Sequence, residues 1–574
     1  MNGTFKGLCG LRIGNFKAFA ETQQISIRPL TLIYGANSAG KSSVIHSLLL
    51  ANHALENGNV DVHQTKIGGA SLDLGGFSQY VHKHELKRRF EWGIEYEHKT
   101  VESVVRYLGG FTLTAIRFQI GLPDTDDRKE PGSNAPRVLA FELHLDGSQL
   151  MGLELQPDAR LHSVSLNFEH PILKAALDKL LDDEAGPSRF DLFDDQPSEE
   201  AEVRWEQEHN ECKARLFSEL DAIVQVIEAY IRKVPFSTEH FLPAGLVPEG
   251  EENEYAYRMP DEQPDAIMDS FDQGGAQGIA RKFRYEIEQL FKLISRNISA
   301  RLNRITYLGP LRCYPPRHST GMHDQDPNWF SGGGQAWEIL RGNPDVLMAV
   351  NQWLAGPDRL AKGYELLVRD LSNIQKIAPE LQAGLEDALG KLRAEPNASI
   401  TEEVESVLKK FTASKSAVVL SEIILQDIRS KTEVSHRDIG QGVSQVLPIL
   451  VSAFALKNQI VAIEQPELHL HPALQAELGD VFIESALGER ANKFLIESHS
   501  EHLLLRIMRR MKETHTGTLA PGKHAVRPCD VAVLYVEPVG TRSIVREMPL
   551  NERGELIKDW PGGFFEEGLR EVLM

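Results

Sequence analysis

The chain of 574 residues has few cysteines, no excess of positive charge and no long apolar run. Its four cysteines (Cys9, Cys212, Cys313 and Cys529) are scattered and include no C-x-x-C pair, which argues against a disulfide framework or a zinc site. The sequence also lacks an apolar segment long enough to span a bilayer and the apolar core of a signal peptide. These absences predict a cytoplasmic protein that makes no membrane contact.

The net charge of −20 restricts the partners that the protein can bind. A protein that grips nucleic acid through a broad surface is usually basic, because neutralising phosphates drives the binding. The basic run at residues 506–512 is interpreted as one face of an amphipathic surface helix. We therefore expect nucleic-acid contact to be weak, local or delivered by a partner.

The most informative segment that is present is residues 35–42, Gly-Ala-Asn-Ser-Ala-Gly-Lys-Ser, which reads G-x-x-x-x-G-K-S. A short apolar run predicts a buried strand at residues 30–34, and residues 43–50 predict the first turns of a helix. Glycines allow the backbone N–H groups to surround a polyphosphate, and the start of the helix adds partial positive charge. Lys41 can reach the β- and γ-phosphates, and the Ser42 hydroxyl can bind Mg²⁺. The sequence therefore predicts a site for a nucleoside triphosphate.

A second part of this site is predicted far downstream, where a continuous apolar strand at residues 459–463 ends in Glu464. A carboxylate at the carboxyl end of a buried strand can hold Mg²⁺ beside the glycine loop. Just upstream, residues 440–444 read G-x-G-x-S at the start of a helix, a second place where an anion can bind. After a further strand, His499 lies at the strand tip, where a histidine can sense or polarise a γ-phosphate.

This ordered series of glycine loop, signature helix, acidic strand end with Pro-Glu-Leu-His-Leu-His-Pro, and histidine resembles the ABC-type ATPase heads of the SMC, RecF and OLD group. The resemblance covers about residues 7–50 and 430–574. It implies an α/β fold, an ABC-type P-loop ATPase head with a mixed sheet flanked by helices and large, mainly helical insertions. In such heads two protomers enclose two nucleotides, so it also implies a homodimer or higher homo-oligomer.

The resemblance assigns roles to individual residues. The residues expected to bind ATP are Gly35, Asn37, Ser38, Ala39, Gly40, Lys41, Ser42, Ser43, Gln79, Gly440, Gly442 and Ser444; the expected Mg²⁺ ligands are Ser42, Gln79 and Glu464; the expected catalytic residues are Glu464, Gln465, Glu467 and His499. Gly442 and Ser444 would act in trans on the partner's nucleotide. Gln79 is the candidate at the position of a Q-loop, and a surface amide in a turn is the alternative.

One departure from the group concerns hydrolysis. The residue after the magnesium carboxylate is usually a glutamate that positions the attacking water, and here it is Gln465. A neutral amide can orient water but cannot accept its proton, and general-base assistance is worth roughly 10²–10⁴-fold. Glu467 is a possible substitute if the turn at Pro466 aims it at the water. We therefore expect slow hydrolysis and a switch controlled mainly by ATP occupancy.

About four hundred residues separate the glycine loop from the signature segment, more than a head requires. The predicted division of the chain is 1–105, first half of the head; 106–304, an insertion with strands, helices and acidic loops; 305–333, a return strand; 334–415, a helical insertion; and 416–574, second half of the head. Arg312 follows the return strand, where it can contact phosphate or brace the head. The absence of a sustained heptad pattern argues against the coiled-coil arm of chromosome-organising members.

Other details resemble the PtuA-like ATPases of anti-phage systems of the Septu type, including those encoded with retrons. These are the Ile-Glu-Gln-Pro-Glu-Leu-His-Leu-His-Pro block, the Leu-Gly-Pro-Leu-Arg strand end and the Trp-Pro-x-Gly-Phe-Phe ending. The resemblance implies assembly with a separate HNH nuclease and, in retron systems, with a reverse transcriptase and its RNA–DNA product. The tail after His499 lacks a D-x-D metal motif, so no nuclease activity is expected in this chain itself.

Two other functions stay open at this point. The chain can be a RecF-like DNA-repair ATPase that binds DNA directly without a nuclease partner, although the charge of −20 weighs against this. It can also be a regulator of the toxin–antitoxin or OLD type whose effector is not a nuclease. The identity of the effector resides in another chain.

Overall fold

The computed structural model describes residues 7–98, 107–108, 110–123, 135–155, 162–185, 199–218, 220–232, 237–239, 241–245, 276–314, 326–356, 363–372, 382–390, 393, 405, 418–434 and 441–561. The strands are β1 Gly7–Gly14, β2 Gln23–Ser26, β3 Leu30–Gly35, β4 Phe90–Glu97, β5 Leu113–Gly121, β6 Arg137–Leu145, β7 Ser148–Leu155, β8 His162–Leu166, β9 Ser237–Glu239, β10 Leu242–Gly245, β11 Ile305–Leu308, β12 Tyr364–Ser372, β13 Val418–Asp427, β14 Glu433–Val434, β15 Ile460–Glu464, β16 Lys493–Glu497, β17 Val531–Val539 and β18 Arg542–Glu547. The helices are α1 Lys41–Asn57, α2 Phe77–Tyr80, α3 Pro171–Ala185, α4 Glu199–Ser218, α5 Leu220–Arg232, α7 Ala276–Leu302, α8 Gln335–Gly342, α9 Pro344–Ala355, α12 Gln441–Ala455, α13 Pro472–Leu487 and α14 Glu501–Thr516.

The head is built on a mixed sheet whose described strands run in the order β11-β15-β16-β3-β17-β18. All neighbouring pairs from β11 to β17 are parallel, and β18 closes the sheet as an antiparallel edge strand. The central strands β3, β15 and β16 are buried along their whole length, as expected for parallel strands covered on both faces. Because these strands are parallel, their carboxyl ends meet at one edge, which becomes the candidate site.

Both faces of this sheet are covered, and the strands supply each face with alternate side chains. In β16, Leu495 packs into one core with α1, whereas Phe494 and Ile496 pack into another core with α12, α13 and α14. β15 and β3 divide their residues in the same way. The mixed sheet flanked by helices agrees with the fold class predicted from the sequence.

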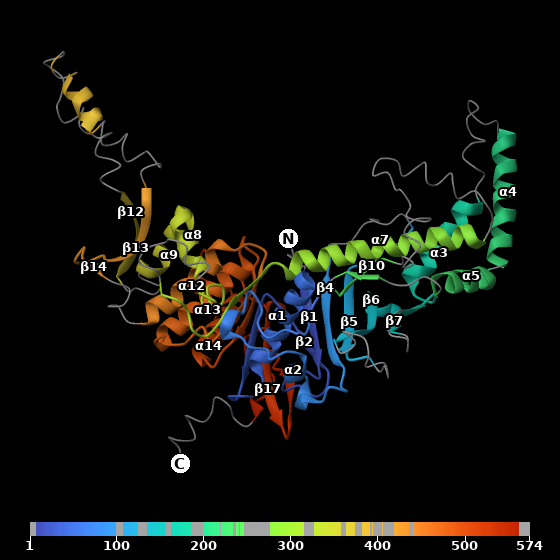
Figure 1. Cartoon of the computed structure of the whole chain (residues 1–574), viewed down its shortest axis with the longest axis horizontal. Coiled ribbons are helices and arrows are strands. Elements are labelled where there is room, and N and C mark those ends of the chain that lie inside the picture. The colour runs from blue at the N-terminus through green and yellow to red at the C-terminus, as the bar shows by residue number, and fades with distance from the viewer. Residues whose placement is uncertain are drawn as a thin grey trace.

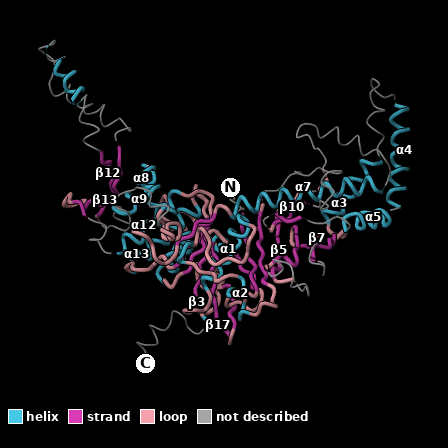
Figure 2. Tube along the Cα trace, in the orientation of Figure 1, coloured by secondary structure: helices cyan, strands magenta, loops and turns pink. Residues whose placement is uncertain are grey.

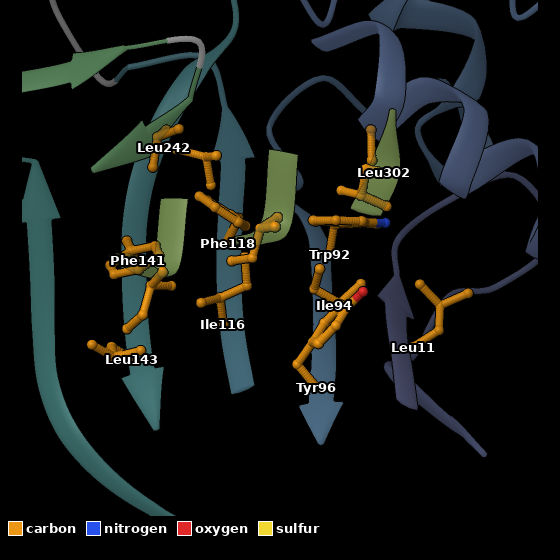
Figure 3. Close-up of a cluster of buried hydrophobic side chains, with 14 of the residues drawn as sticks. Leu11, Trp92, Ile94, Tyr96, Ile116, Phe118, Phe141, Leu143, Leu242 and Leu302 are labelled. Carbon is orange, nitrogen blue, oxygen red and sulfur yellow. The ribbon is translucent and has the colours of Figure 1, made fainter. Parts of the chain in front are cut away.

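A second sheet is antiparallel and lies against the α1 side of the head. Its described strands run in the order β2-β1-β4-β5-β6-β7-β8. Figure 3 shows how its inward side chains, among them Trp92 of β4, Phe118 of β5 and Phe141 of β6, form one apolar layer that Leu302 of α7 joins. The predicted boundary between residues 105 and 106 falls between β4 and β5, which pair within this sheet.

Two groups of elements extend from the head in opposite directions (Figures 1 and 2). On one side α7 runs outward and meets α3 and α5, with α4 at the far end. On the other side β12, β13 and β14 form a small antiparallel sheet beyond α8 and α9. None of the helices in the described part of the chain is long and apolar enough to cross a membrane.

The second insertion contains a strand that its sequence pattern does not indicate. Residues 334–415, predicted to be helical, include α8 and α9 but also strand β12, which pairs with β13 from residue 364 to 372. The earlier insertion contributes β5 to β8 to the antiparallel sheet besides its helices. Strand formation depends on a distant partner, and β12 and β13 are separated by more than forty residues, so local periodicity does not reveal it.

Candidate nucleotide site

The glycine loop joins β3 to α1 at the edge where the parallel strands end. Gly35 and Gly40 have φ angles of +146° and +98°, and a Cβ atom would lie 2.4 Å from the Val536 carbonyl oxygen at Gly35 and 2.6 Å from Ala18 Cβ at Gly40. Only glycine fits such positions without displacing its neighbours. The loop shape is therefore set by the two glycines of the motif.

The start of α1 leaves its first backbone N–H groups without a side-chain cap. Its N-cap is Gly40, which has no side chain to cap them, and its first turn contains no acidic residue. Helices α9 and α14, in contrast, begin at Asn343 and Ser500, whose side chains accept from Val346 N and Leu503 N. An uncapped helix start with the positive end of the helix dipole suits a phosphate group.

Lys41 is the first residue of α1, directly after this loop, and 4% of its surface is exposed. Its Nζ donates to the carbonyl oxygens of Gly35 at 3.1 Å and Ala36 at 2.9 Å, and lies 4.0 Å from Glu497 Oε1. Burial lowers the pKa of Lys41, and the nearby carboxylates oppose this shift. The lysine is therefore held at the loop, where it can turn from carbonyl oxygens to phosphate oxygens.

Glu464 ends β15 and is buried, and hydrogen bonds fix one of its carboxylate oxygens. Its Oε1 accepts from Tyr307 Oη at 3.0 Å and from His46 Nε2 at 3.1 Å. His46 Nδ1 in turn lies 2.9 Å from Lys17 Nζ. Since the lysine donates to Nδ1, the histidine carries its proton on Nε2 and donates to Glu464. Burial, followed by the charge of Lys17, lowers the pKa of His46, in keeping with a neutral ring.

Glu497 ends the neighbouring strand β16, and it pairs in register with Glu464. Burial raises the pKa of Glu497 to about 7, and the charge of Glu464 adds to this rise, whereas Ser42 and Lys41 lower it. Sequence reasoning missed this residue, although the argument used for Glu464, a carboxylate at the end of a buried strand, applies to it equally. Lys17, His46 and Tyr307 carried no comparable signal, because their grouping depends on the fold.

Arg312 connects the acidic strand end to the signature helix. Its Nη2 donates to the Glu464 carbonyl at 2.7 Å, and both Nη atoms lie 3.4 Å from the Gln465 carbonyl. Its own backbone exchanges two hydrogen bonds with the side-chain amide of Gln445 in α12. Burial lowers the pKa of Arg312 to about 10, so the guanidinium stays charged at neutral pH. Of the two predicted roles, this geometry is that of a brace.

The residues after Glu464 form a tight turn. Gln465 has a φ of +44°, and its backbone N–H donates to the Glu497 carbonyl at 2.8 Å. Glu467 Oε2 accepts from Ser498 Oγ at 2.8 Å and Oε1 from the His499 backbone N–H at 2.7 Å. Both oxygens of Glu467 therefore hold the loop before α14, and its role as a substitute base stays a prediction. Burial and the charge of Lys41 lower the pKa of His499, which favours a neutral ring.

The other predicted residues lie in different surroundings. Ser42 is partly exposed beside Glu497, Ser43 is buried, and Gln79 is exposed on α2. At Gly442 a Cβ atom would lie 2.8 Å from the His469 carbonyl oxygen, so the start of α12 touches the loop after β15. Ser444 is fully buried in this conformation, so a contact with a partner's nucleotide would need a rearrangement there. Gly440 lies outside the described residues.

The oxygen-only donor set at this edge suits Mg²⁺ bound together with a nucleotide. Ser42 and Glu464 supply oxygens of the kind that Mg²⁺ prefers, and the remaining positions are usually filled by phosphate oxygens and water. Within the described ranges, no group of three or more His, Cys, Asp or Glu side chains could hold a metal by itself. When bound, Mg²⁺ would neutralise the charge on the phosphates.

Comparison with known proteins found one matching family and several similar solved structures. Residues 347–504 match the family described as AAA ATPase domain, a segment that holds α12, Glu464 and His499 but not the glycine loop. The structure is similar to the Smc head domain with an extended coiled coil, bound to the C-terminal domain of ScpA, from Pyrococcus furiosus (TM-score 0.33, 11% identity, 99% of each chain covered). It is also similar to the SMC head domain from Thermotoga maritima (TM-score 0.33, 8% identity, 95% of this chain and 99% of that chain covered). No curated protein matches the chain. The matched segment and the glycine loop together show an ATP-binding and ATP-hydrolysing domain in an α/β P-loop head.

Proposed function

We propose that this chain is a slow, ATP-operated switch that dimerises around nucleotide and regulates a partner nuclease of the HNH type. The proposed setting is bacterial anti-phage defence of the Septu or retron kind, in the cytoplasm. The observation that supports a switch is the set of hydrogen bonds made by Arg312. They connect the Glu464 strand end, at the nucleotide edge, to α12, the helix on which the second insertion packs.

The path from the site to the insertion is continuous. Gln445 of α12 holds the Arg312 backbone, and helices α8 and α9 pack on α12. Trp353 of α9 is fully buried against Phe454 of α12, with ring centroids 6.3 Å apart. A shift of the Glu464 strand end on nucleotide binding would therefore reach the insertion through packed, rigid elements.

Slow hydrolysis follows from the groups available to activate water. Gln465 cannot accept a proton, and Glu467 is engaged by Ser498 and His499. Such a site changes state mainly by binding and releasing ATP. The overall negative charge suits a protein that controls a nuclease rather than one that grips DNA.

The decisive experiment is affinity purification of this chain, expressed with its native neighbouring genes, in ATP and without nucleotide. Mass spectrometry and nucleic-acid analysis then identify what co-purifies. We expect a stoichiometric HNH nuclease, with or without a reverse transcriptase and its RNA–DNA product, whose retention differs between wild type and Lys41→Ala. A lone ATPase dimer, or one that carries only DNA with a steep salt dependence, would overturn the proposal in favour of a RecF-like repair ATPase.

A further inference from the structure

Glu497 is a buried carboxylate at the nucleotide edge to which neither the motifs nor the comparisons assign a role. Its exposed fraction is 5%, and its Oε2 accepts no hydrogen bond from any described residue. Burying a carboxylate without full hydrogen bonding is costly, and native proteins usually avoid it unless the group has a task. The carboxylate therefore keeps an oxygen available at the place where the phosphates are expected.

The neighbours of Glu497 define what it could bind. On one side it pairs in register with Glu464, and on the other side with Ile33 of β3, two residues before the glycine loop begins. The Ser42 hydroxyl is close enough to lower its pKa through a hydrogen bond. Two carboxylates and a serine hydroxyl thus converge on one end of the sheet, and Mg²⁺ in ATPases is commonly bound by one or two carboxylates together with phosphates.

We propose that Glu497 is a second carboxylate ligand of the Mg²⁺ that accompanies ATP, acting with Ser42 and Glu464. This inference rests on the ATP site of the proposed function and deepens it. Glu497 would offer the cation an oxygen from the end of a strand, whereas the predicted ligand Gln79 lies exposed on the short helix α2. A cation between Glu464 and Glu497 would remove the repulsion between two neighbouring buried negative charges.

A purely structural role for Glu497 as the counter-ion of Lys41 fits the geometry less well. The two groups lie 4.0 Å apart, beyond hydrogen-bond distance, while Lys41 donates to the carbonyl oxygens of Gly35 and Ala36. The two roles differ in a measurable way. Loss of a counter-ion would alter nucleotide binding whether or not a metal is present, whereas loss of a ligand would weaken metal binding alone.

The test measures Mn²⁺ binding to the full chain saturated with a non-hydrolysable ATP analogue, by electron paramagnetic resonance of free Mn²⁺. Affinity for the analogue in EDTA and the thermal unfolding midpoint are recorded in parallel. For Glu497→Gln we expect Mn²⁺ affinity to fall roughly 10–100-fold, with analogue binding in EDTA retained and the protein folded. Glu497→Asp should recover part of the Mn²⁺ affinity, because it restores the charge.

The matched control is Glu477→Gln, which removes a carboxylate of α13 that lies outside the site and already accepts from Arg506 Nη2 at 2.8 Å. It should leave Mn²⁺ affinity within about threefold of wild type. Wild-type Mn²⁺ affinity in folded Glu497→Gln, or an equal loss of analogue binding in EDTA and in Mn²⁺, overturns the proposal for Glu497. Failure of wild type to bind the analogue at all is a separate result, because it overturns the ATP site itself.

Discussion

Two buried carboxylates in the head, Asp480 and Glu497, have nearly equal exposure, at 4% and 5%, but opposite surroundings. The carboxylate of Asp480 in α13 forms ion pairs with three cations. The distances from its Oδ2 are 2.8 Å to Arg506, 2.6 Å to Arg510 and 3.6 Å to Lys523. Despite burial, hydrogen bonds from Arg510 and the charges around it lower its pKa. Glu497 has one cation at 4.0 Å and a second carboxylate beside it, and its pKa is raised to about 7.

This difference indicates that the charge of Asp480 stabilises the fold, whereas the charge of Glu497 serves to bind a ligand. The cations around Asp480 join α13 to α14, and no ligand is needed to complete that cluster. At the strand ends, burial and the charge of Glu464 outweigh the effects of Ser42 and Lys41, so the pKa of Glu497 is raised. Perturbed groups of this kind concentrate at functional sites. The predictions below test this distinction between stability and binding.

The largest expected effect on stability is that of Asp480→Ala. Removing one partner from a buried, hydrogen-bonded charge cluster should lower the free energy of unfolding by about 3–5 kcal/mol. Denaturant unfolding measures the loss, and ATP affinity of the remaining folded protein should be unchanged. Arg509→Ala is the control, since Arg509 is largely exposed and its contact with Glu513 should contribute less than about 1 kcal/mol. A weakened ATP affinity in Asp480→Ala would show that Asp480 also contributes to the nucleotide site and would contradict its assignment to stability alone.

Lys41→Ala should weaken ATP binding and leave the stability of the fold nearly unchanged, the reverse of Asp480→Ala. Loss of a buried cation that binds phosphate should weaken ATP binding by about 2–5 kcal/mol, a factor of at least tens, measured by calorimetry. The unfolding midpoint without nucleotide should change little, because Lys41 donates only to loop carbonyls. Lys523→Ala, from the Asp480 cluster, is the matched control and should bind ATP as wild type does. Equal ATP affinity in Lys41→Ala and wild type would refute the P-loop assignment.

Arg312→Lys tests the connection between the two regions of the site. A single lysine Nζ cannot reproduce the three contacts that the two Nη atoms of Arg312 make with the Glu464 and Gln465 carbonyls, so the free energy of unfolding should fall by about 1.5–3 kcal/mol. ATP should still bind, but the nucleotide-dependent change in retention of the partner should be reduced. Arg341→Lys in α8 is the control, because no described residue forms a hydrogen bond with its guanidinium. Unaltered nucleotide dependence in Arg312→Lys would show that coupling follows another route.

The smallest effect is a pH dependence of opposite sign at the two carboxylates. The raised pKa of Glu497 means that its charged form destabilises the fold above about pH 7 and that this cost disappears on acidification toward the pKa of the unfolded chain. Glu497→Gln should therefore be more stable than wild type at pH 8, by about 1–3 kcal/mol, and equal to it near pH 4.

The lowered pKa of Asp480 acts in the other direction. Its contribution to stability is present above the pKa of the unfolded chain and is lost as pH falls through the lower folded value. Asp480→Asn should therefore differ from wild type most at neutral pH and least in acid. Calorimetric unfolding midpoints between pH 4 and 8 measure both variants. If the difference in unfolding midpoint from wild type changed with pH in the same direction for Glu497→Gln and Asp480→Asn, the opposite surroundings of the two carboxylates would be contradicted.

Much of the head could be predicted from local sequence, because its determinants lie close together in the chain. The glycine loop, the strand before it and the helix after it span residues 30–57, and their geometry depends on two glycines and a continuous apolar strand. The strands that end at Glu464 and Glu497 were predicted for the same reason, since buried parallel strands are short apolar runs. Strand β12 was not predicted, because its partner β13 lies more than forty residues away in the sequence. The pairing of β4 with β1, which joins β5 to β8 to the head, was not predicted for the same reason.

By itself, the sequence determined that the chain binds a nucleotide, since G-x-x-x-x-G-K-S between a strand and a helix requires no distant contact to build a phosphate site. Only the tertiary structure decided which side chains complete that site. Parallel pairing places Glu497 beside Glu464, and the return of β11 brings Tyr307 and Arg312 to the same edge. The physical reason is that charge and hydrogen bonding act over a few ångströms, whereas Tyr307 and Arg312 lie 157 and 152 positions away from Glu464 in the chain.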